Sequence, residues 1–244
     1  MAYGWRWLRS LLFIAQMYLM MLVYGLLFIL PAMLSRDWAF RGVHAYCHWV
    51  RWTASWMVGL RSEIRGEVPD DEVLVASKHQ SFFDIILIVS VLPRPKFIMK
   101  KSLTRAPILG WYAKRIGCVP VDRGKRGQAI KTMVAAVHEG RQQPGQLIIY
   151  PQGTRVAPGV ERPYKIGTGV LYAQLKEDCV PAATNVGVFW PRRGIYRKPG
   201  LAVVEFLPRI GSGQPIDAFM AELEHVVEHA SDALMAEAGF KVKA

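Results

Sequence analysis

The stretch EVLVASKHQSFFDII, residues 72–86, joins an apolar run to a polar turn and then to a second apolar run. The first run has the length and composition of a buried β-strand, and the second suits the start of a helix. Strand–turn–helix units of this kind build α/β sheets. His79 and Asp84 lie just beyond the carboxyl end of the strand, where such sheets bind their ligands. The stretch therefore predicts a fold class and a place where chemistry would occur.

The same alternation continues along the chain. Short apolar runs recur at 96–100, 118–122, 146–150, 179–184 and 201–206. Stretches with helical patterning lie at about 82–91, 107–115, 127–139, 165–176 and 216–238. Alternating strands and helices predict an α/β fold with a central mixed, largely parallel sheet and helices on its faces.

The amino-terminal part of the chain has a different pattern. Ser10–Ser35 contains no charged residue, and as a helix its 26 residues would reach about 39 Å, enough to cross a hydrocarbon core of about 30 Å. Val43–Leu60 carries histidine and arginine on one side and three tryptophans on another, which suits either a membrane interface or packing against the rest of the protein. We therefore expect a two-helix membrane anchor over residues 1–62, followed by an α/β domain over 63–244.

Charge and cysteine content narrow the possible functions. The 244-residue chain has a formal net charge of +12, which favours a polyanionic partner such as nucleic acid, an anionic membrane or a phosphorylated substrate. No known nucleic-acid-binding motif is visible, so we expect anionic membrane lipids or phosphate as partners, and no nucleic acid. Three scattered cysteines without a CxxC pair argue against a disulfide-stabilised fold and for a reducing compartment.

Spacing alone leaves two interpretations of the first turn open. Ser81-Phe82-Phe83-Asp84 matches the S-x-x-[DE] pattern of a helix cap. Alternatively, Asp84 in the first helical turn accepts a hydrogen bond from His79 in the loop. That bond would fix the tautomer of the imidazole and make its other nitrogen a better base.

Two further turns follow predicted strands. GCVPVDRGKRG, residues 117–127, and YPQGTRV, residues 150–156, each bring arginine and glycine together. Glycine lets backbone amides approach an anion closely, and the planar arginine fork matches a phosphate group. Each turn is thus either a phosphate site or a solvent-exposed basic turn.

One more stretch, HVVEH at residues 225–229, matches the H-x-x-E-H pattern of some zinc hydrolases. So short a match arises easily by chance, and the predicted helix around it is regular and acidic. We therefore expect surface histidines and no metal site.

Four blocks in order carry a family resemblance: His79-x4-Asp84, GCVPVDR, PQGTR at 151–155 and VPAA at 180–183. Together they resemble the motif blocks of the glycerolipid acyltransferases, in particular the bacterial 1-acyl-sn-glycerol-3-phosphate acyltransferases. KKSLTRAPILG, residues 100–110, is similar to the lysine-containing segment before the second block. The resemblance covers about residues 75–190, and the two-helix anchor is similar to that of the membrane-associated members.

This resemblance implies transfer of a fatty acyl group from acyl-CoA or acyl carrier protein to the sn-2 hydroxyl of lysophosphatidate. The product would be phosphatidate, made at a bacterial inner membrane with the catalytic domain facing the cytoplasm. His79 would be the general base, and Asp84 would orient and stabilise it. The substrate alcohol attacks the thioester directly, so the resemblance implies no metal, no cofactor and no enzyme nucleophile.

The resemblance also implies roles for binding residues. The substrate phosphate would be held by Arg123, Arg155 and Lys100, and the oxyanion or the acceptor would be contacted by Gln152, Gly153 and Thr154. Most of the family has Glu-Gly-Thr-Arg in the third block, whereas this chain has Gln152, which can hydrogen-bond but cannot carry the charge or act as a base. Two alternatives stay open: an acyltransferase for another lysolipid, such as a lyso-ornithine lipid, and a non-catalytic lipid-binding membrane protein.

Overall fold

The computed structural model describes residues 2–121, 134–135 and 144–241 of the chain. Within these residues the elements are, in order, α1 (Ala2–Leu34), α2 (Arg36–Val58), β1 (Leu60–Arg65), β2 (Leu74–Ser77), α3 (Phe83–Val89), β3 (Lys96–Lys100), η1 (Lys101–Arg105), α4 (Pro107–Arg115), β4 (Val119–Val121), β5 (Leu147–Ile149), α6 (Gly167–Leu175), β6 (Cys179–Thr184), η2 (Val186–Val188), β7 (Gly200–Phe206) and α7 (Ile216–Glu237). The helix predicted at 127–139 lies almost entirely outside the described residues.

The strands of the described chain form one sheet in the order β1-β7-β6-β2-β5-β3-β4. β6, β2, β5, β3 and β4 run parallel, whereas β7 is antiparallel to β6 and β1 is parallel to β7. The predicted fold class, a mixed and largely parallel sheet, is confirmed. Because β2, β5 and β3 are parallel, the segments that follow them emerge at the same edge of the sheet.

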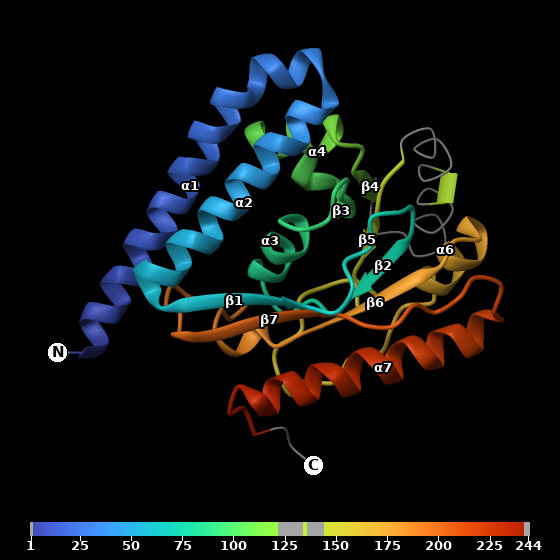
Figure 1. Cartoon of the computed structure of the whole chain (residues 1–244). Coiled ribbons are helices and arrows are strands. Elements are labelled where there is room, and N and C mark those ends of the chain that lie inside the picture. The colour runs from blue at the N-terminus through green and yellow to red at the C-terminus, as the bar shows by residue number, and fades with distance from the viewer. Residues whose placement is uncertain (1, 122–133, 136–143, 242–244) are drawn as a thin grey trace.

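Helices cover both faces of this sheet (Figure 1). In β2, Val75 packs in the core shared with α2 and α3, whereas Leu74 and Ala76 pack in the core shared with α6 and α7. This alternation follows from strand geometry, since successive side chains point to opposite faces. Every residue of β2 is buried, as expected for a central strand covered on both sides.

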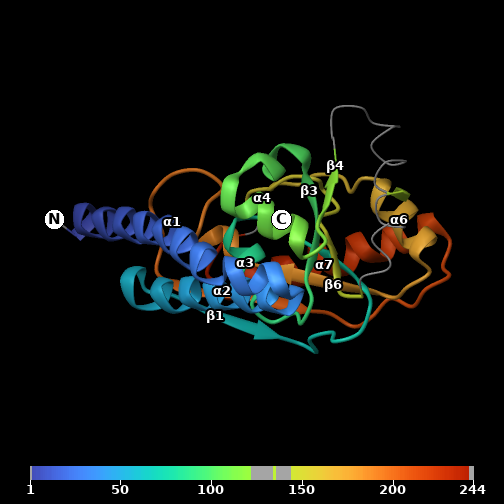
Figure 2. The same ribbon diagram turned by 90° about the horizontal axis from the view of Figure 1, so that it is seen from above.

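α1 and α2 form an antiparallel hairpin along one side of the molecule (Figures 1 and 2). α1 is the one helix among the described residues that is long and apolar enough to cross a membrane. α2 begins at Arg36 rather than at the predicted Val43, because Ser35 caps it and accepts a hydrogen bond from the Asp37 N–H at 3.2 Å. The two predicted amino-terminal helices are therefore present and pack against each other.

α1 is fastened to the body of the protein near both of its ends. Near its start, Ser10 Oγ accepts a hydrogen bond from the Arg197 N–H at 3.0 Å. Near its end, Arg115 Nε donates to the Ala32 carbonyl oxygen at 2.8 Å. The outward side of the helix is apolar and exposed, with Leu19, Leu22, Leu26, Leu27 and Leu30. α1 therefore lies along the protein rather than projecting from it.

β1 is a strand that the hydrophobic pattern does not reveal. Its sequence, LRSEIR, has charges at three of six positions, and Leu60 is its only fully buried residue. An edge strand tolerates such a pattern because it has a neighbour on one side only, here β7. The predicted division between residues 62 and 63 falls inside this strand. The division into an anchor and a catalytic domain stays a prediction.

Candidate active site

The predicted site segments follow parallel neighbouring strands, so they meet at one edge of the sheet. His79 follows β2, the segment Gln152–Arg155 follows β5, and Lys100 ends β3. This edge is where parallel α/β sheets bind ligands. Arg123 lies outside the described residues.

Asp84 makes both of the contacts that its spacing suggested. One oxygen, Oδ1, lies 2.9 Å from His79 Nδ1. The other, Oδ2, accepts hydrogen bonds from the backbone N–H groups of Gln80 at 2.8 Å and Ser81 at 2.7 Å. Ser81 Oγ in turn accepts from the Phe83 N–H at 3.2 Å, so Ser81 and Asp84 form a reciprocal capping box that begins one residue before Phe82, the N-cap position of α3. The carboxylate is fully buried, so these bonds hold it and the turn in one geometry.

The imidazole of His79 is held on two sides. With Nδ1 bonded to Asp84, the nitrogen left to accept a proton is Nε2. The ring stacks on Tyr150, with centroids 3.9 Å apart and planes inclined by 20°, and the side chain is 13% exposed. Burial and the Asp84 carboxylate raise the pKa of Tyr150 well above its ordinary value, so the phenol stays protonated. Tyr150 belongs to the YPQGTRV stretch, but no pattern in the sequence indicates its contact with His79.

Gln152 is buried rather than open to solvent. Its Nε2 lies 3.3 Å from the Arg162 carbonyl oxygen and 3.3 Å from Glu228 Oε1. Its Oε1 has no hydrogen-bond partner among the described residues. Gly153 has a φ of 69°, which favours glycine, and its N–H donates to the Tyr150 carbonyl oxygen at 2.8 Å. That amide is therefore engaged in a turn, and the oxyanion role of Gly153 and Thr154 stays a prediction.

Glu228, on α7, joins the site from the far end of the chain. It forms an ion pair with Lys78, whose side chain is only 3% exposed, and accepts a hydrogen bond from Tyr164 Oη at 2.9 Å. Burial and the nearby carboxylate raise the pKa of Tyr164, which keeps it a donor. Lys78 precedes His79, so this network ties the His79 turn, the Gln152 turn and α7 together.

This network also shows what the glutamate of the HVVEH stretch contacts. The rings of His225 and His229 stack with centroids 6.0 Å apart. Glu228 lies instead against Lys78 and Gln152. The described residues contain no group of three or more metal-binding side chains.

The two predicted phosphate-binding cations that the structure describes lie near the surface. Arg155 is half-buried, and its Nη1 lies 3.4 Å from the Arg192 carbonyl oxygen, while Arg192 Nη1 donates to the Arg155 carbonyl oxygen at 3.2 Å. Lys100 is exposed at the end of β3. Arg155 and Lys100 thus follow or end strands that reach the same edge of the sheet as His79, and their phosphate-binding role stays a prediction.

Comparison with known proteins identifies relatives of the whole chain. A family model described as "Acyltransferase" matches residues 60–185. The 1-acyl-sn-glycerol-3-phosphate acyltransferase of Pseudomonas aeruginosa is 26% identical over 234 residues, covering 94% of this chain and 91% of the relative. A protein of the same name from Saccharomyces cerevisiae is 28% identical over 163 residues, covering 64% of this chain and 54% of the relative. The crystal structure of the 1-acyl-sn-glycerophosphate acyltransferase of Thermotoga maritima superposes with a TM-score of 0.77 at 18% identity, covering 95% of this chain and 99% of that one.

Proposed function

The chain belongs to the acyltransferase family, and we propose that it is a 1-acylglycerol-3-phosphate O-acyltransferase. It transfers a fatty acyl group to the sn-2 hydroxyl of lysophosphatidate and releases phosphatidate. The name of the Pseudomonas aeruginosa relative, which aligns with 94% of the chain, supports this reaction. The observation that carries the proposal is the 2.9 Å hydrogen bond between His79 and Asp84, placed at the ligand-binding edge of the sheet.

In the proposed mechanism, His79 Nε2 takes the proton of the acceptor hydroxyl as its oxygen attacks the thioester carbonyl. Asp84 keeps the proton on Nδ1 and stabilises the imidazolium that forms. The C–S bond then breaks, and His79 returns the proton to the departing thiolate. The acyl donor is acyl-CoA or acyl carrier protein, and its acyl group passes directly to the acceptor.

The same proposal assigns the binding contacts. Arg155, Lys100 and Arg123 hold the phosphate of the acceptor, since cations lie beside the His79 edge at the two described positions. Gln152, with a buried amide whose oxygen has no described partner, contacts the acceptor. Gly153 and Thr154 contact the oxyanion or the acceptor.

We also propose that residues 1–62 hold the enzyme on a membrane and that residues 63–244 form the catalytic domain. The long apolar helix α1 and the exposed Trp52 and Trp56 of α2 support this assignment. The membrane would be a bacterial inner membrane, with the catalytic domain in the cytoplasm, where acyl-CoA and acyl carrier protein are present. Anionic lipids would add attraction to the basic chain.

The test is turnover by purified full-length protein in detergent micelles. The parent protein is incubated with lysophosphatidate or lyso-ornithine lipid, each with acyl-CoA or acyl carrier protein as donor, and phosphatidate or the acylated ornithine lipid is measured. His79→Ala should lower kcat by about 10³-fold or more. His229→Ala removes an exposed histidine on α7 and serves as the matched control.

Three results would reject the proposal in part or as a whole. Parent-level turnover in the His79→Ala variant would reject the mechanism. Turnover of lyso-ornithine lipid without turnover of lysophosphatidate would reject lysophosphatidate as the acceptor but not acyl transfer as the reaction. Absence of turnover on both acceptors with both donors would favour a lipid-binding protein.

A further inference from the structure

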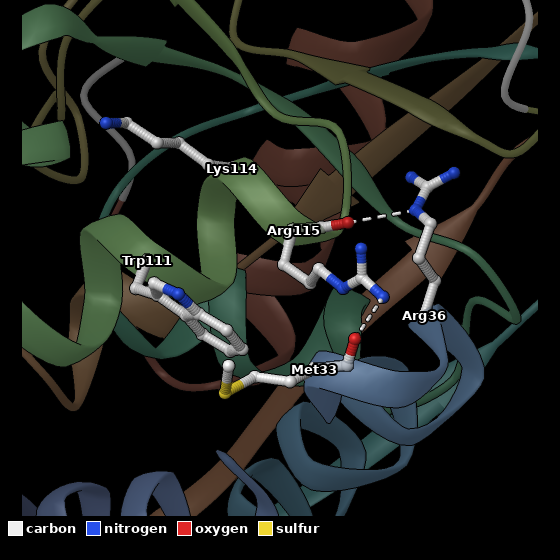
Figure 3. Close-up of a pocket in the computed structure, with 5 residues that line it drawn as sticks. All are labelled: Met33, Arg36, Trp111, Lys114 and Arg115. Atoms are coloured by element: carbon white, nitrogen blue, oxygen red, sulfur yellow. Dashed lines mark hydrogen bonds between the residues drawn. The ribbon is translucent and has the colours of Figure 1, made fainter. Parts of the chain in front are cut away.

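A second site lies at the tip of the α1–α2 hairpin. A pocket of about 450 Å³ is lined by Met33, Arg36, Trp111, Lys114 and Arg115 (Figure 3). Its volume is in the usual range for small-ligand sites, about 300–1,000 Å³. Arg115 precedes β4, so the pocket lies toward the amino end of that strand, whereas His79 follows the carboxyl end of the parallel strand β2. The pocket is therefore distinct from the candidate active site.

Two guanidinium groups in this pocket are fixed by the backbone. Arg36 Nε donates to the Arg115 carbonyl oxygen at 2.9 Å. Arg115 donates from Nε to the Ala32 carbonyl oxygen at 2.8 Å and from Nη2 to the Met33 carbonyl oxygen at 3.2 Å. These bonds orient both groups without using the Nη1 and Nη2 atoms of Arg36. Lys114 lies at the rim, and its amine points away from the two guanidiniums (Figure 3).

The positive charge in the pocket is only partly offset by the described residues around it. Neither Arg36 nor Arg115 forms an ion pair within that part of the chain. The nearby acid, Asp37, pairs with Arg94 at 3.2 Å. Burial lowers the pKa of Arg36, the charges of Arg115 and Arg94 lower it further, and the charge of Asp37 raises it by a smaller amount. Such a pair of like charges, held close by backbone bonds, is stabilised by an anion that bridges it.

The surroundings of the pocket indicate which kind of anion fits. Leu30, Met33 and Leu34 are 72%, 61% and 88% exposed, so the end of α1 presents bare apolar surface beside the guanidiniums. Trp111 forms another wall of the pocket. A free phosphate ion gains nothing from apolar surface, whereas a phospholipid can place its chains there and its phosphate on the arginines.

We propose that this pocket binds the phosphate group of an anionic membrane phospholipid. Arg36 and Arg115 hold the phosphate, Trp111 and Met33 contact the glycerol and the first methylenes of the chains, and Lys114 adds positive charge at the rim. The inference rests on the membrane association proposed above but not on the acyl transfer. Bound in this way, a lipid fixes the hairpin tip at the level of the headgroups.

Lipid affinity of the full-length protein in neutral detergent tests this site. Dioctanoyl phosphatidylglycerol, dioctanoyl phosphatidylcholine and inorganic phosphate are titrated separately, and binding is measured by calorimetry. We expect phosphatidylglycerol to bind most tightly, and Arg36→Gln to weaken it by about tenfold or more, because a bidentate charge-assisted contact is lost. Arg36→Lys, which keeps the charge, should restore part of the loss.

Matched variants distinguish lipid binding in this pocket from attraction by general surface charge and from binding at the active site. Arg41→Gln removes an exposed arginine of α2 that stacks on Trp38, and should change the affinity by less than about threefold. Arg155→Ala alters the His79 edge and should weaken phosphatidylglycerol binding much less than Arg36→Gln does. Equal losses for Arg36→Gln and Arg41→Gln, or a loss only for Arg155→Ala, would overturn the inference. So would inorganic phosphate binding as tightly as the lipid. Because the readout is binding, failure of the proposed acyl transfer would not change it.

Discussion

Asp84 makes three hydrogen bonds from a fully buried carboxylate, and the two oxygens have different tasks. Oδ2 holds the backbone of the turn through the Gln80 and Ser81 amides, and Oδ1 holds His79 Nδ1. A helix cap and a catalytic pair are therefore compatible in this turn. The S-x-x-D spacing could not distinguish them because both depend on the same side chain.

Asp84→Asn separates these two tasks. The amide oxygen can still accept from the backbone, but the NH₂ group then faces His79 Nδ1 and favours the tautomer with its proton on Nε2. We expect a loss of about 10²–10⁴-fold in kcat with a folded protein. Circular dichroism checks the fold, and steady-state turnover checks the loss.

Ser81→Ala is the control for the cap. It removes the bond from the Phe83 N–H to Ser81 Oγ while leaving the His79–Asp84 bond. The free energy of unfolding should fall by about 1 kcal/mol with little change in kcat. If Ser81→Ala and Asp84→Asn reduced kcat equally, the cap alone would account for the role of Asp84.

Gln152 departs from the glutamate found in most of the family, and its neighbour gives a physical reason. Its amide nitrogen lies 3.3 Å from Glu228 Oε1, so Gln152→Glu would place a second carboxylate beside the first in a buried site. We expect the free energy of unfolding to fall by about 2 kcal/mol, measured by urea denaturation in detergent. Gln152→Glu combined with Glu228→Gln should recover most of that loss. Full stability of the single variant would show that the two side chains do not interact.

Among the elements, α7 has a role that its position in the sequence does not suggest. It packs on the sheet through Phe219, Leu223 and Val227, and it also delivers Glu228 to the buried Lys78. Removing the carboxylate by Glu228→Gln leaves the Lys78 ammonium buried without its counter-charge. That should cost about 3 kcal/mol of stability and lower kcat, because Lys78 is next to His79.

A double-mutant cycle with Lys78→Met measures this coupling. The double variant should lose about 1–3 kcal/mol less of the free energy of unfolding than the two single variants lose together. Glu222→Gln, an exposed change on the same helix, should stay within about 0.5 kcal/mol of the parent. Additive losses in the cycle would argue that the ion pair does not link α7 to the His79 turn.

The predicted elements differ in how well their residues reveal them. The runs of β2, β5 and β6 can be read directly because every residue of these strands is buried. β3 and β7 are buried at their centres and can also be recognised by their apolar residues. β1 lies at the sheet edge, where LRSEIR needs to bury only Leu60, so no hydrophobic run marks it. α2 begins seven residues before Val43 because a serine cap, rather than hydrophobic periodicity, determines its start.

At the scale of the whole molecule, only part of the site could be predicted from the sequence. That part consists of the residues whose position follows from the pairing of parallel strands. His79, Gln152 and Lys100 each follow or end a predicted strand, and parallel pairing of β2, β5 and β3 brings them to one edge. Glu228 is 150 residues from Lys78 in the sequence and lies in a regular helix, so no local pattern links it to the site. Tyr150 likewise depends on the tertiary contact with His79.

The placement of α1 yields a prediction for the whole molecule. Its 33 residues would extend about 50 Å, long enough to cross a bilayer. Both ends nevertheless touch the same body: Tyr3 stacks on Tyr196 at 5.4 Å, and Arg115 binds the Ala32 carbonyl. A crossing helix would separate its ends by a hydrocarbon core of about 30 Å. We therefore expect α1 to lie in one leaflet, with both ends on the cytoplasmic side.

Gly4→Cys tests that placement, because nothing lies within 4 Å of the position where the new Cβ would be. The native thiols interfere little: Cys47 and Cys179 are buried, and burial raises the pKa of Cys118 to about 12, so it is not a thiolate near pH 7.5. A membrane-impermeant maleimide should label Gly4→Cys in inside-out vesicles and not in intact spheroplasts. Labelling after detergent solubilisation is the positive control for each sample. Labelling from the outside of spheroplasts would show that α1 crosses the membrane, and its contacts with Tyr196 and Arg115 could not then coexist in the cell.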